Sequence, residues 1–254
     1  MRIAVAGGTG TVGSYVVEAA RGRGHEVVVL SRSAGVDLMT GAGLDAALAG
    51  VDVVIDTSNR QATSAKASTE FFTTVTRNLL AAEQRAGVPH HVALSIVGVD
   101  RAPYGYYAGK LAQERAVEAG PVPWTILRVT QFHEFAEQML AGLTVAGLHV
   151  APKLPTQPVA AREVGERLVE LAERAPAGRA PEFAGPRRER LEDMIRRFAE
   201  ATGVRGPILA LALPGKQFQA MRRGEALPGP DAVLARQSFD EWLAERAASP
   251  RAVR

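Results

Sequence analysis

Tyr106 and Lys110 are the residue pair in this sequence whose types and spacing most clearly suggest chemistry. They lie four positions apart at the start of a helical pattern, so their side chains are expected on one face of a helix. An ammonium group beside a phenol favours the phenolate and lowers the phenol pKa. A phenol tuned in this way can give or take a proton at a substrate oxygen. We therefore predict that Tyr106 and Lys110 are catalytic, with aromatic packing as the other interpretation of Tyr106 and with Tyr104 and Tyr107 as competitors.

Ser95 is a third candidate catalytic residue. It follows an apolar run, residues 92–94, that is typical of a buried strand. A hydroxyl at the carboxyl end of such a strand can donate a hydrogen bond to the substrate oxygen that Tyr106 would serve. The alternative is an ordinary hydrogen bond at the end of the strand.

A glycine-rich stretch near the start of the chain predicts a phosphate-binding loop. The glycines are Gly7, Gly10 and Gly13, between an apolar run at 2–6 and a helical pattern at 14–21. This strand–loop–helix context allows a tight turn, close approach of a pyrophosphate to the backbone, and close packing of helix on strand. The amide groups at the helix start would face the phosphates. We predict a dinucleotide site formed by Gly7, Thr9, Gly10, Thr11, Val12 and Gly13; a P-loop is excluded because its lysine is missing.

Arg32 follows the second expected strand, at the position that selects between the two nicotinamide dinucleotides. An acid there would bind the ribose 2′-hydroxyl of NAD(H), whereas an arginine accommodates the 2′-phosphate of NADP(H). Ser31 and Ser33 flank Arg32, and no acidic residue occurs before Asp37. We predict NADP(H) in preference to NAD(H), with Arg32 as an ordinary surface residue as the alternative. Asp37 would accept a hydrogen bond from the adenine amino group or serve as a turn residue.

Strands and helices alternate along the first half of the chain. Strands are expected at 2–6, 26–30, 51–56, 92–94 and 124–129, with a further short strand at 36–38, and helices at 14–21, 44–49 and 66–86. This order predicts a doubly wound parallel α/β sheet. Ligands bind outside the carboxyl ends of such strands, so Thr57, Ser58 and Asn59 are predicted to line the cofactor groove.

The glycine loop, Ser95 and the Tyr106–Lys110 spacing together resemble the short-chain dehydrogenase/reductase superfamily. The sequence around Gly7–Gly10, Ser31–Ser33, Trp124–Arg128 and Gln131-Phe132 is similar to its atypical, NmrA-like branch. The resemblance covers nearly the whole chain and implies a Rossmann core that binds NAD(P)H, with Lys110 on the nicotinamide ribose. Some members of that branch reduce quinones or enones without a working tyrosine, and some only sense the nucleotide.

The resemblance also implies a domain division and a substrate region. We expect an NAD(P)-binding core at 1–130 and a small C-terminal substrate lobe at 131–254, with a segment near 182–186 returning to the sheet. Phe132, His133 and Phe135 occupy the stretch where the family places substrate; packing is the alternative for His133. A metal site is not expected, because the sequence from His133 to Glu137 lacks a second histidine and the chain has no cysteine.

Composition limits the other possibilities. The chain has 254 residues, a formal net charge of +3 and no apolar run as long as a membrane span. We expect a cytoplasmic protein with a small-molecule substrate and no nucleic-acid or membrane partner, as a monomer or a homodimer. The leading hypothesis is an NADPH-dependent oxidoreductase that transfers hydride to a small carbonyl, quinone or enone. The alternatives are a non-catalytic NADP(H)-sensing regulator and an epimerase or dehydratase of the same fold.

Overall fold

The computed structural model describes residues 1–60, 64–145 and 147–248. Within them the chain forms two compact units. The first contains Met1–Val129 and Ala161–Pro181, and the second contains Thr130–Ala160 and the rest of the chain from Glu182. The chain therefore enters each unit twice.

A parallel sheet forms the centre of the first unit. Its strands are β1 (Arg2–Ala6), β2 (Glu26–Leu30), β3 (Val53–Asp56), β4 (His91–Ile96) and β5 (Trp124–Val129), with the short β9 (Gly178–Arg179) beside β5. They are arranged in the order β2-β1-β3-β4-β5, and each pairs in parallel with its neighbour. Apolar runs suit these strands because a parallel sheet is covered on both faces.

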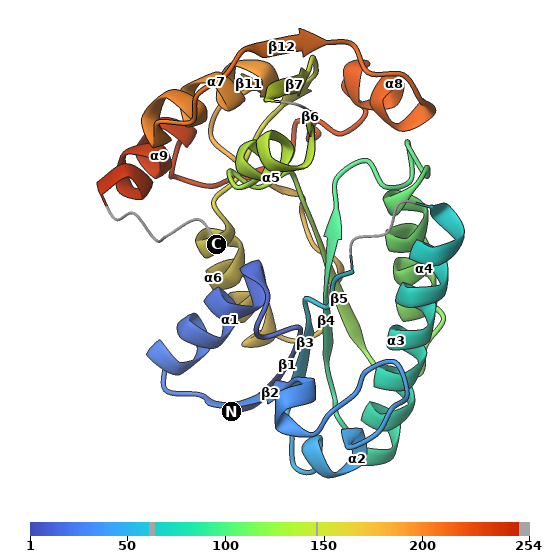
Figure 1. Cartoon of the computed structure of the whole chain (residues 1–254). Coiled ribbons are helices and arrows are strands. Elements are labelled where there is room, and N and C mark those ends of the chain that lie inside the picture. Colours follow the sequence, from blue (N-terminus) through green and yellow to red (C-terminus); the bar gives the residue numbers. More distant parts are fainter. Residues whose placement is uncertain (61–63, 146, 249–254) are drawn as a thin grey trace. The chain divides into compact units, whose positions relative to one another are not determined.

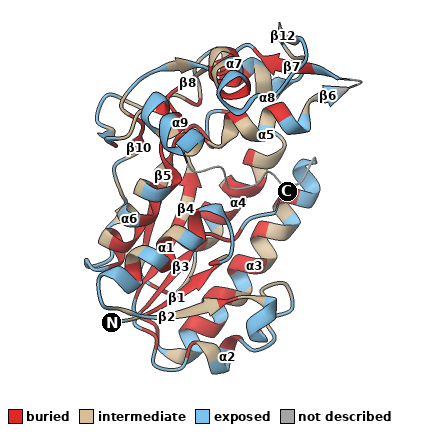
Figure 2. Ribbon diagram, turned by 60° about the vertical axis from the view of Figure 1, so that its left-hand side comes forward, coloured by how far each residue is buried: buried red, intermediate tan, exposed pale blue. Residues whose placement is uncertain are grey.

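Helices cover both faces of this sheet (Figure 1). On one face α1 (Thr11–Gly22) packs against α6 (Ala161–Ala172), and on the other α3 (Ala65–Ala86) packs against α4 (Tyr106–Glu118). The short α2 (Leu44–Ala47) contacts α3 and β2. Helices on both faces of a parallel sheet confirm the predicted doubly wound Rossmann architecture. Figure 2 shows that the buried residues are concentrated on the central strands and on the helix sides that face them.

The prediction of a short strand at 36–38 is wrong. This segment follows a single turn of 3₁₀ helix, η1 (Arg32–Ala34), and forms a turn instead. The carboxylate of Asp37 accepts hydrogen bonds from the amides of Met39 (2.8 Å) and Thr40 (3.3 Å), and its carbonyl accepts one from Gly41. Aspartate stabilises such turns by replacing backbone partners that a neighbouring strand would supply.

The second unit is built from short strands and helices. Its helices are α5 (Phe135–Gly142), α7 (Leu191–Thr202), α8 (Lys216–Arg222) and α9 (Phe239–Ala248). Its strands are β6 (Thr144–Val145), β7 (Leu148–Pro152), β8 (Pro155–Thr156), β10 (Phe183–Ala184), β11 (Glu189–Arg190), β12 (Ile208–Leu211) and β13 (Val233–Leu234). They pair as β12-β7-β6, β11-β8 and β10-β13. Met194, Ile195 and Phe198 of α7 belong to the apolar core of this unit.

Candidate functional site

The glycine loop connects β1 to α1 in a conformation that requires glycine at two positions. Gly7 has a φ of 74°, in the left-handed region, and its carbonyl accepts a hydrogen bond from the amide of Gly10 at 2.9 Å. A Cβ atom at Gly13 would lie 2.1 Å from that same carbonyl oxygen. The first turn of α1 therefore lies directly against the end of β1.

The start of α1 presents backbone amides to a ligand. Gly10 is the N-cap and has no side chain with which to satisfy them, and no acidic residue lies in the first turn. The amides of Thr11, Val12 and Gly13 carry the partial positive charge of a helix N-terminus. Thr9 and Thr11 are exposed beside them. This arrangement suits an anionic phosphate group.

The end of β3 lies against the glycine loop. A Cβ atom at Gly7 would lie 2.7 Å from the carbonyl oxygen of Thr57 and 2.9 Å from backbone atoms of Ser58. The Thr57 hydroxyl donates to the carbonyl of Ala6 at 2.8 Å, so it ties β3 to β1. The Ser58 hydroxyl is buried without a hydrogen-bond partner among the described residues. A buried hydroxyl needs a partner, so Ser58 fits a polar ligand at this place.

Arg32 and its two neighbouring serines lie just beyond β2. All three side chains are at least partly exposed, and the hydroxyls of Ser31 and Ser33 lie 3.0 Å apart. Asp37 is engaged in the turn described above. Of its two expected roles, the structure supports that of a turn residue.

Tyr106 is the first residue of α4, and its hydroxyl donates to the side-chain oxygen of Asn59 at 2.8 Å. This contact places two of the predicted residues together. The expected fall in the phenol pKa is wrong for this structure. Burial, with a smaller contribution from Tyr107, raises the pKa of Tyr106 well above its usual value.

Lys110 is turned into the interior, with 4% of its surface exposed. Its ammonium donates to the carbonyl of Leu94 at 2.6 Å and to the side-chain oxygen of Gln113, and lies 4.7 Å from the centre of the Phe72 ring. Burial lowers the pKa of Lys110 to about 8, although Asp56 and Glu114 oppose this shift. The Lys110 ammonium thus donates to Leu94 and Gln113, and it loses its proton more easily than an exposed lysine does.

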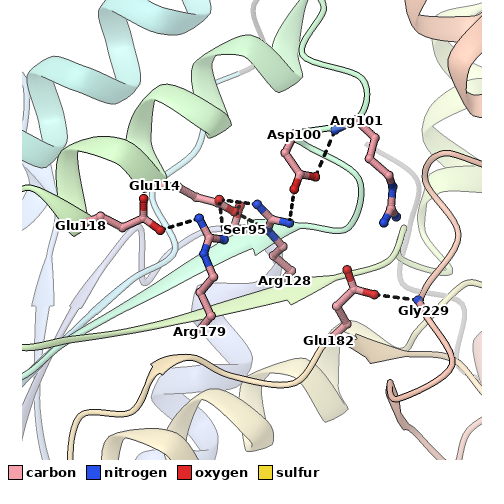
Figure 3. A network of polar contacts seen from close by, with 9 residues as sticks. All are labelled: Ser95, Asp100, Arg101, Glu114, Glu118, Arg128, Arg179, Glu182 and Gly229. Carbon is pink, nitrogen blue, oxygen red and sulfur yellow. Dashed lines mark hydrogen bonds and ion pairs between the residues drawn. The ribbon is translucent and has the colours of Figure 1, made fainter.

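Ser95 does not join this group. Its hydroxyl donates to the Glu114 carboxylate, which also accepts from Arg128 at 2.7 and 2.9 Å and from Arg179 at 3.0 Å. Figure 3 shows Ser95 within this network of charged side chains. Burial opposes the charge of Glu114, but the hydrogen bonds from Arg128 and Ser95 lower its pKa. Ser95 therefore acts here as a strand-end hydrogen-bond donor.

The predicted substrate residues belong to the second unit. His133 is fully buried, and its Nε2 donates to the carbonyl of Gln237 at 3.2 Å. Its ring lies 5.7 Å from those of Phe239 and Trp242, and burial lowers its pKa to about 4. These contacts support packing for His133, while Phe132 and Phe135 remain partly exposed. In the described part of the chain, no group of three His, Cys, Asp or Glu side chains could hold a metal ion.

Three site residues escaped sequence reasoning: Asp56, Gln113 and Glu114. Each is a polar side chain with 1% or less of its surface exposed. Gln113 accepts a hydrogen bond from Lys110 and donates one to Asp56, while Glu114 accepts one from Ser95. A signal was present, since Gln113 lies one helical turn after Lys110 and Asp56 ends an otherwise apolar strand. Their pairing depends on contacts between distant parts of the chain.

Comparison with known proteins agrees with this geometry. Residues 7–174 match a protein family described as NAD(P)H-binding. The photosystem II assembly factor Ycf39 of Synechocystis sp. is 34% identical over 111 residues, which cover 38% of this chain. The matched region spans 34% of the length of that relative.

Solved structures share the fold over nearly the whole chain. The NADPH-dependent quinone oxidoreductase QOR2 of Escherichia coli has a TM-score of 0.69 at 16% identity, covering 96% of this chain and 98% of its own. MoeE5, solved with UDP-glucose and NAD, has a TM-score of 0.75 at 18% identity and covers 98% of each chain. At these identities the likeness establishes the fold, and the two proteins differ in cofactor. In the described residues, no helix combines the length and apolarity needed to cross a bilayer.

Proposed function

Because this chain belongs to the NAD(P)H-binding family, we propose that it is an NADPH-dependent reductase of small carbonyl, quinone or enone compounds. The observation that carries the proposal is the contact of the α1 N-terminus with the end of β1, held by Gly7 and Gly13. It leaves backbone amides for the pyrophosphate. The orphan hydroxyl of Ser58 lies beside the same loop and fits a polar group of the cofactor.

The predicted cofactor residues have separable tasks in this proposal. Arg32 binds the 2′-phosphate that distinguishes NADPH from NADH, assisted by the hydroxyls of Ser31 and Ser33. Thr57 holds the β3 end in place, and Lys110 supplies a positive charge for the nicotinamide ribose. The nicotinamide, when bound, supplies the hydride.

Tyr106 would serve as the proton donor of this reaction. Its hydroxyl is protonated at physiological pH and so has a proton to give, although burial raises the pKa of the phenol and makes it a weaker acid. Its hydrogen bond to Asn59 orients it at the carboxyl end of β3. If Tyr106 is not the donor, water supplies the proton. Phe132 and Phe135 are the residues that we propose for substrate contact.

A cofactor titration followed by a turnover assay tests the proposal. We expect the purified protein to bind NADPH more tightly than NADH, measured by the fluorescence of the reduced nicotinamide. It should then oxidise NADPH, followed by absorbance, with at least one compound from a panel of quinones, aldehydes and enones. Absence of NADPH binding at millimolar concentration would overturn the proposal.

Two rival functions have specific support. MoeE5 was solved with UDP-glucose and NAD, which favours an epimerase or dehydratase acting on a nucleotide sugar. The engagement of Ser95 with Glu114 favours an NADP(H)-sensing regulator, because a sensor needs no serine donor at a substrate. Conversion of a UDP-sugar would support the first rival. Tight NADP(H) binding with no turnover of any substrate would support the second.

A further inference from the structure

The Lys110 ammonium has partners on three elements, and one of these partners, a side-chain amide, can present either its oxygen or its nitrogen. The carbonyl of Leu94 belongs to β4, and the ring of Phe72 belongs to α3. The third partner, Gln113, lies on α4 with Lys110 itself. A glutamine side chain presents an oxygen that accepts and a nitrogen that donates. Its orientation therefore decides whether Lys110 meets an acceptor or a competing donor.

Asp56 sets that orientation. The Gln113 nitrogen donates to one carboxylate oxygen of Asp56 at 2.8 Å, and the amide of Ser58 donates to the other at 2.8 Å. An ionised carboxylate only accepts hydrogen bonds, and an ammonium group only donates them. The amide between them can satisfy both in one way, with its nitrogen toward Asp56 and its oxygen toward Lys110. Asp56, Gln113 and Lys110 thus form a buried ion pair connected through an amide.

We propose that Asp56 and Gln113 are positioning residues that keep the Lys110 ammonium charged and in place for the cofactor. The proposal rests on the function proposed above, in which Lys110 binds the nicotinamide ribose. Asp56 also holds the backbone of Ser58. The same carboxylate therefore orders two parts of the predicted cofactor site, the loop after β3 and the lysine on α4.

The charges around Lys110 make its protonation sensitive to Asp56. Burial disfavours the ammonium, while Asp56 on β3 and Glu114 on α4 favour it, and together they leave the pKa of Lys110 at about 8. The residues that contact it from α3 and β4, Phe72 and Leu94, carry no charge. Glu114 is neutralised by Arg128 and Arg179, so Asp56 is the acidic group whose removal should matter most.

Lysine NMR on the protein without cofactor measures this coupling directly. The chain contains four lysines, so a sample labelled with ¹³C at lysine Cε gives few signals, and Lys110→Arg identifies that of Lys110. We expect Asp56→Asn and Gln113→Met each to lower the Lys110 pKa by about one unit or more, since a lost opposite charge or acceptor disfavours the ammonium. Asp52→Asn is the matched control; its carboxylate accepts from the amide of Arg2 and should leave Lys110 unchanged.

NADPH titration then shows whether the coupling serves the cofactor. At pH 8, Asp56→Asn should weaken NADPH binding about fivefold, because a one-unit fall in the Lys110 pKa lowers the charged fraction of this lysine from about a half to about a tenth. In a Lys110→Met background the same substitution should add less than about twofold, because the lysine is gone and asparagine keeps a side-chain oxygen that can accept from the Ser58 amide.

Two results would overturn the inference. The first is that the wild type binds NADPH but the Lys110 pKa is the same in the wild type and in a folded variant, either Asp56→Asn or Gln113→Met. The other is an equal loss of NADPH affinity from Asp56→Asn with and without Lys110. By contrast, a coupled Lys110 pKa in a wild-type protein that binds no NADPH would overturn the proposed function, because the NMR measurement needs no cofactor.

Discussion

The Tyr106 hydroxyl and the Asn59 side chain, 2.8 Å apart, show how single contacts decide the chemistry of this site. The spacing of Tyr106 and Lys110 correctly predicted one helix for both. It could not predict that Lys110 turns inward to Leu94 and Gln113, because those partners come from the fold. The apolar run before Ser95 likewise predicts its position near a strand end. It does not predict that the hydroxyl donates to Glu114, because Glu114 lies on another element.

Replacing Tyr106 by phenylalanine tests its role as proton donor. We expect kcat to fall by about 10²-fold or more, the usual contribution of a positioned general acid. The NADPH dissociation constant should change by less than about twofold, since the phenol hydroxyl binds Asn59 rather than the glycine loop. Steady-state kinetics and cofactor titration measure the two effects. Tyr15→Phe, on α1, serves as the control, and full activity of Tyr106→Phe would assign the proton to water.

Replacing Arg32 by alanine tests the choice of cofactor. A charge-assisted contact with a phosphate is worth about 1.5–3 kcal/mol, so NADPH should bind roughly 10- to 100-fold more weakly. NADH binding should hardly change, because NADH lacks the 2′-phosphate. Arg21→Ala is the control, because Arg21 is exposed at the C-terminal end of α1, away from the glycine loop. An equal loss for NADPH and NADH would contradict a 2′-phosphate contact at Arg32.

At the scale of helices and strands, the glycine loop and the alternation of elements were predictable because they are local patterns. The five long strands and α1, α2 and α3 lie close to their expected positions. The strand expected at 36–38 failed because Asp37 satisfies the backbone locally. Gly165 gave no signal in the sequence, although it lets α6 approach α1: a Cβ there would lie 2.8 Å from the backbone of Tyr15.

The contact between α6 and α1 can be tested at Gly165. Alanine ordinarily stabilises a helix relative to glycine, but at Gly165 its methyl group would collide with α1. We expect Gly165→Ala to lower the free energy of unfolding by about 1–3 kcal/mol, the usual cost of overpacking. Gly22→Ala, at a helical glycine with open space around it, should be neutral or slightly stabilising. Urea unfolding of both variants measures the difference, and equal stabilities would contradict the close approach.

At the scale of the whole molecule, buried histidines in both units should make stability depend on pH. Burial lowers the pKa of His90 in the first unit and of His133 in the second to about 4. The unfolded chain binds these protons near pH 6.5, so between pH 6.5 and 4 it holds more protons than the folded protein. The stabilisation is complete above pH 6.5 and is lost as the pH falls through 4.

Urea unfolding at pH 7.5 and pH 4.5 checks this expectation. Each histidine should account for up to roughly 3 kcal/mol of the loss, at 1.36 kcal/mol for each unit of pKa shift. His90→Gln and His133→Gln should each make the pH dependence shallower, since glutamine does not titrate. His91 acts in the opposite direction, because burial opposes its charge but Glu83 raises its pKa. An unchanged pH dependence in both glutamine variants would therefore show that neither His90 nor His133 is held neutral.

The double passage of the chain through each unit has a practical consequence for anyone who wishes to divide this protein. A fragment cut after Val129 would keep the glycine loop and the five long strands but lose α6, the partner of α1. It would also lose Arg179, one of the two cations that neutralise Glu114. Such a fragment would expose apolar surface to water and tend to aggregate. A minimal nucleotide-binding piece would instead have to splice Ala161–Pro181 back on through an artificial linker.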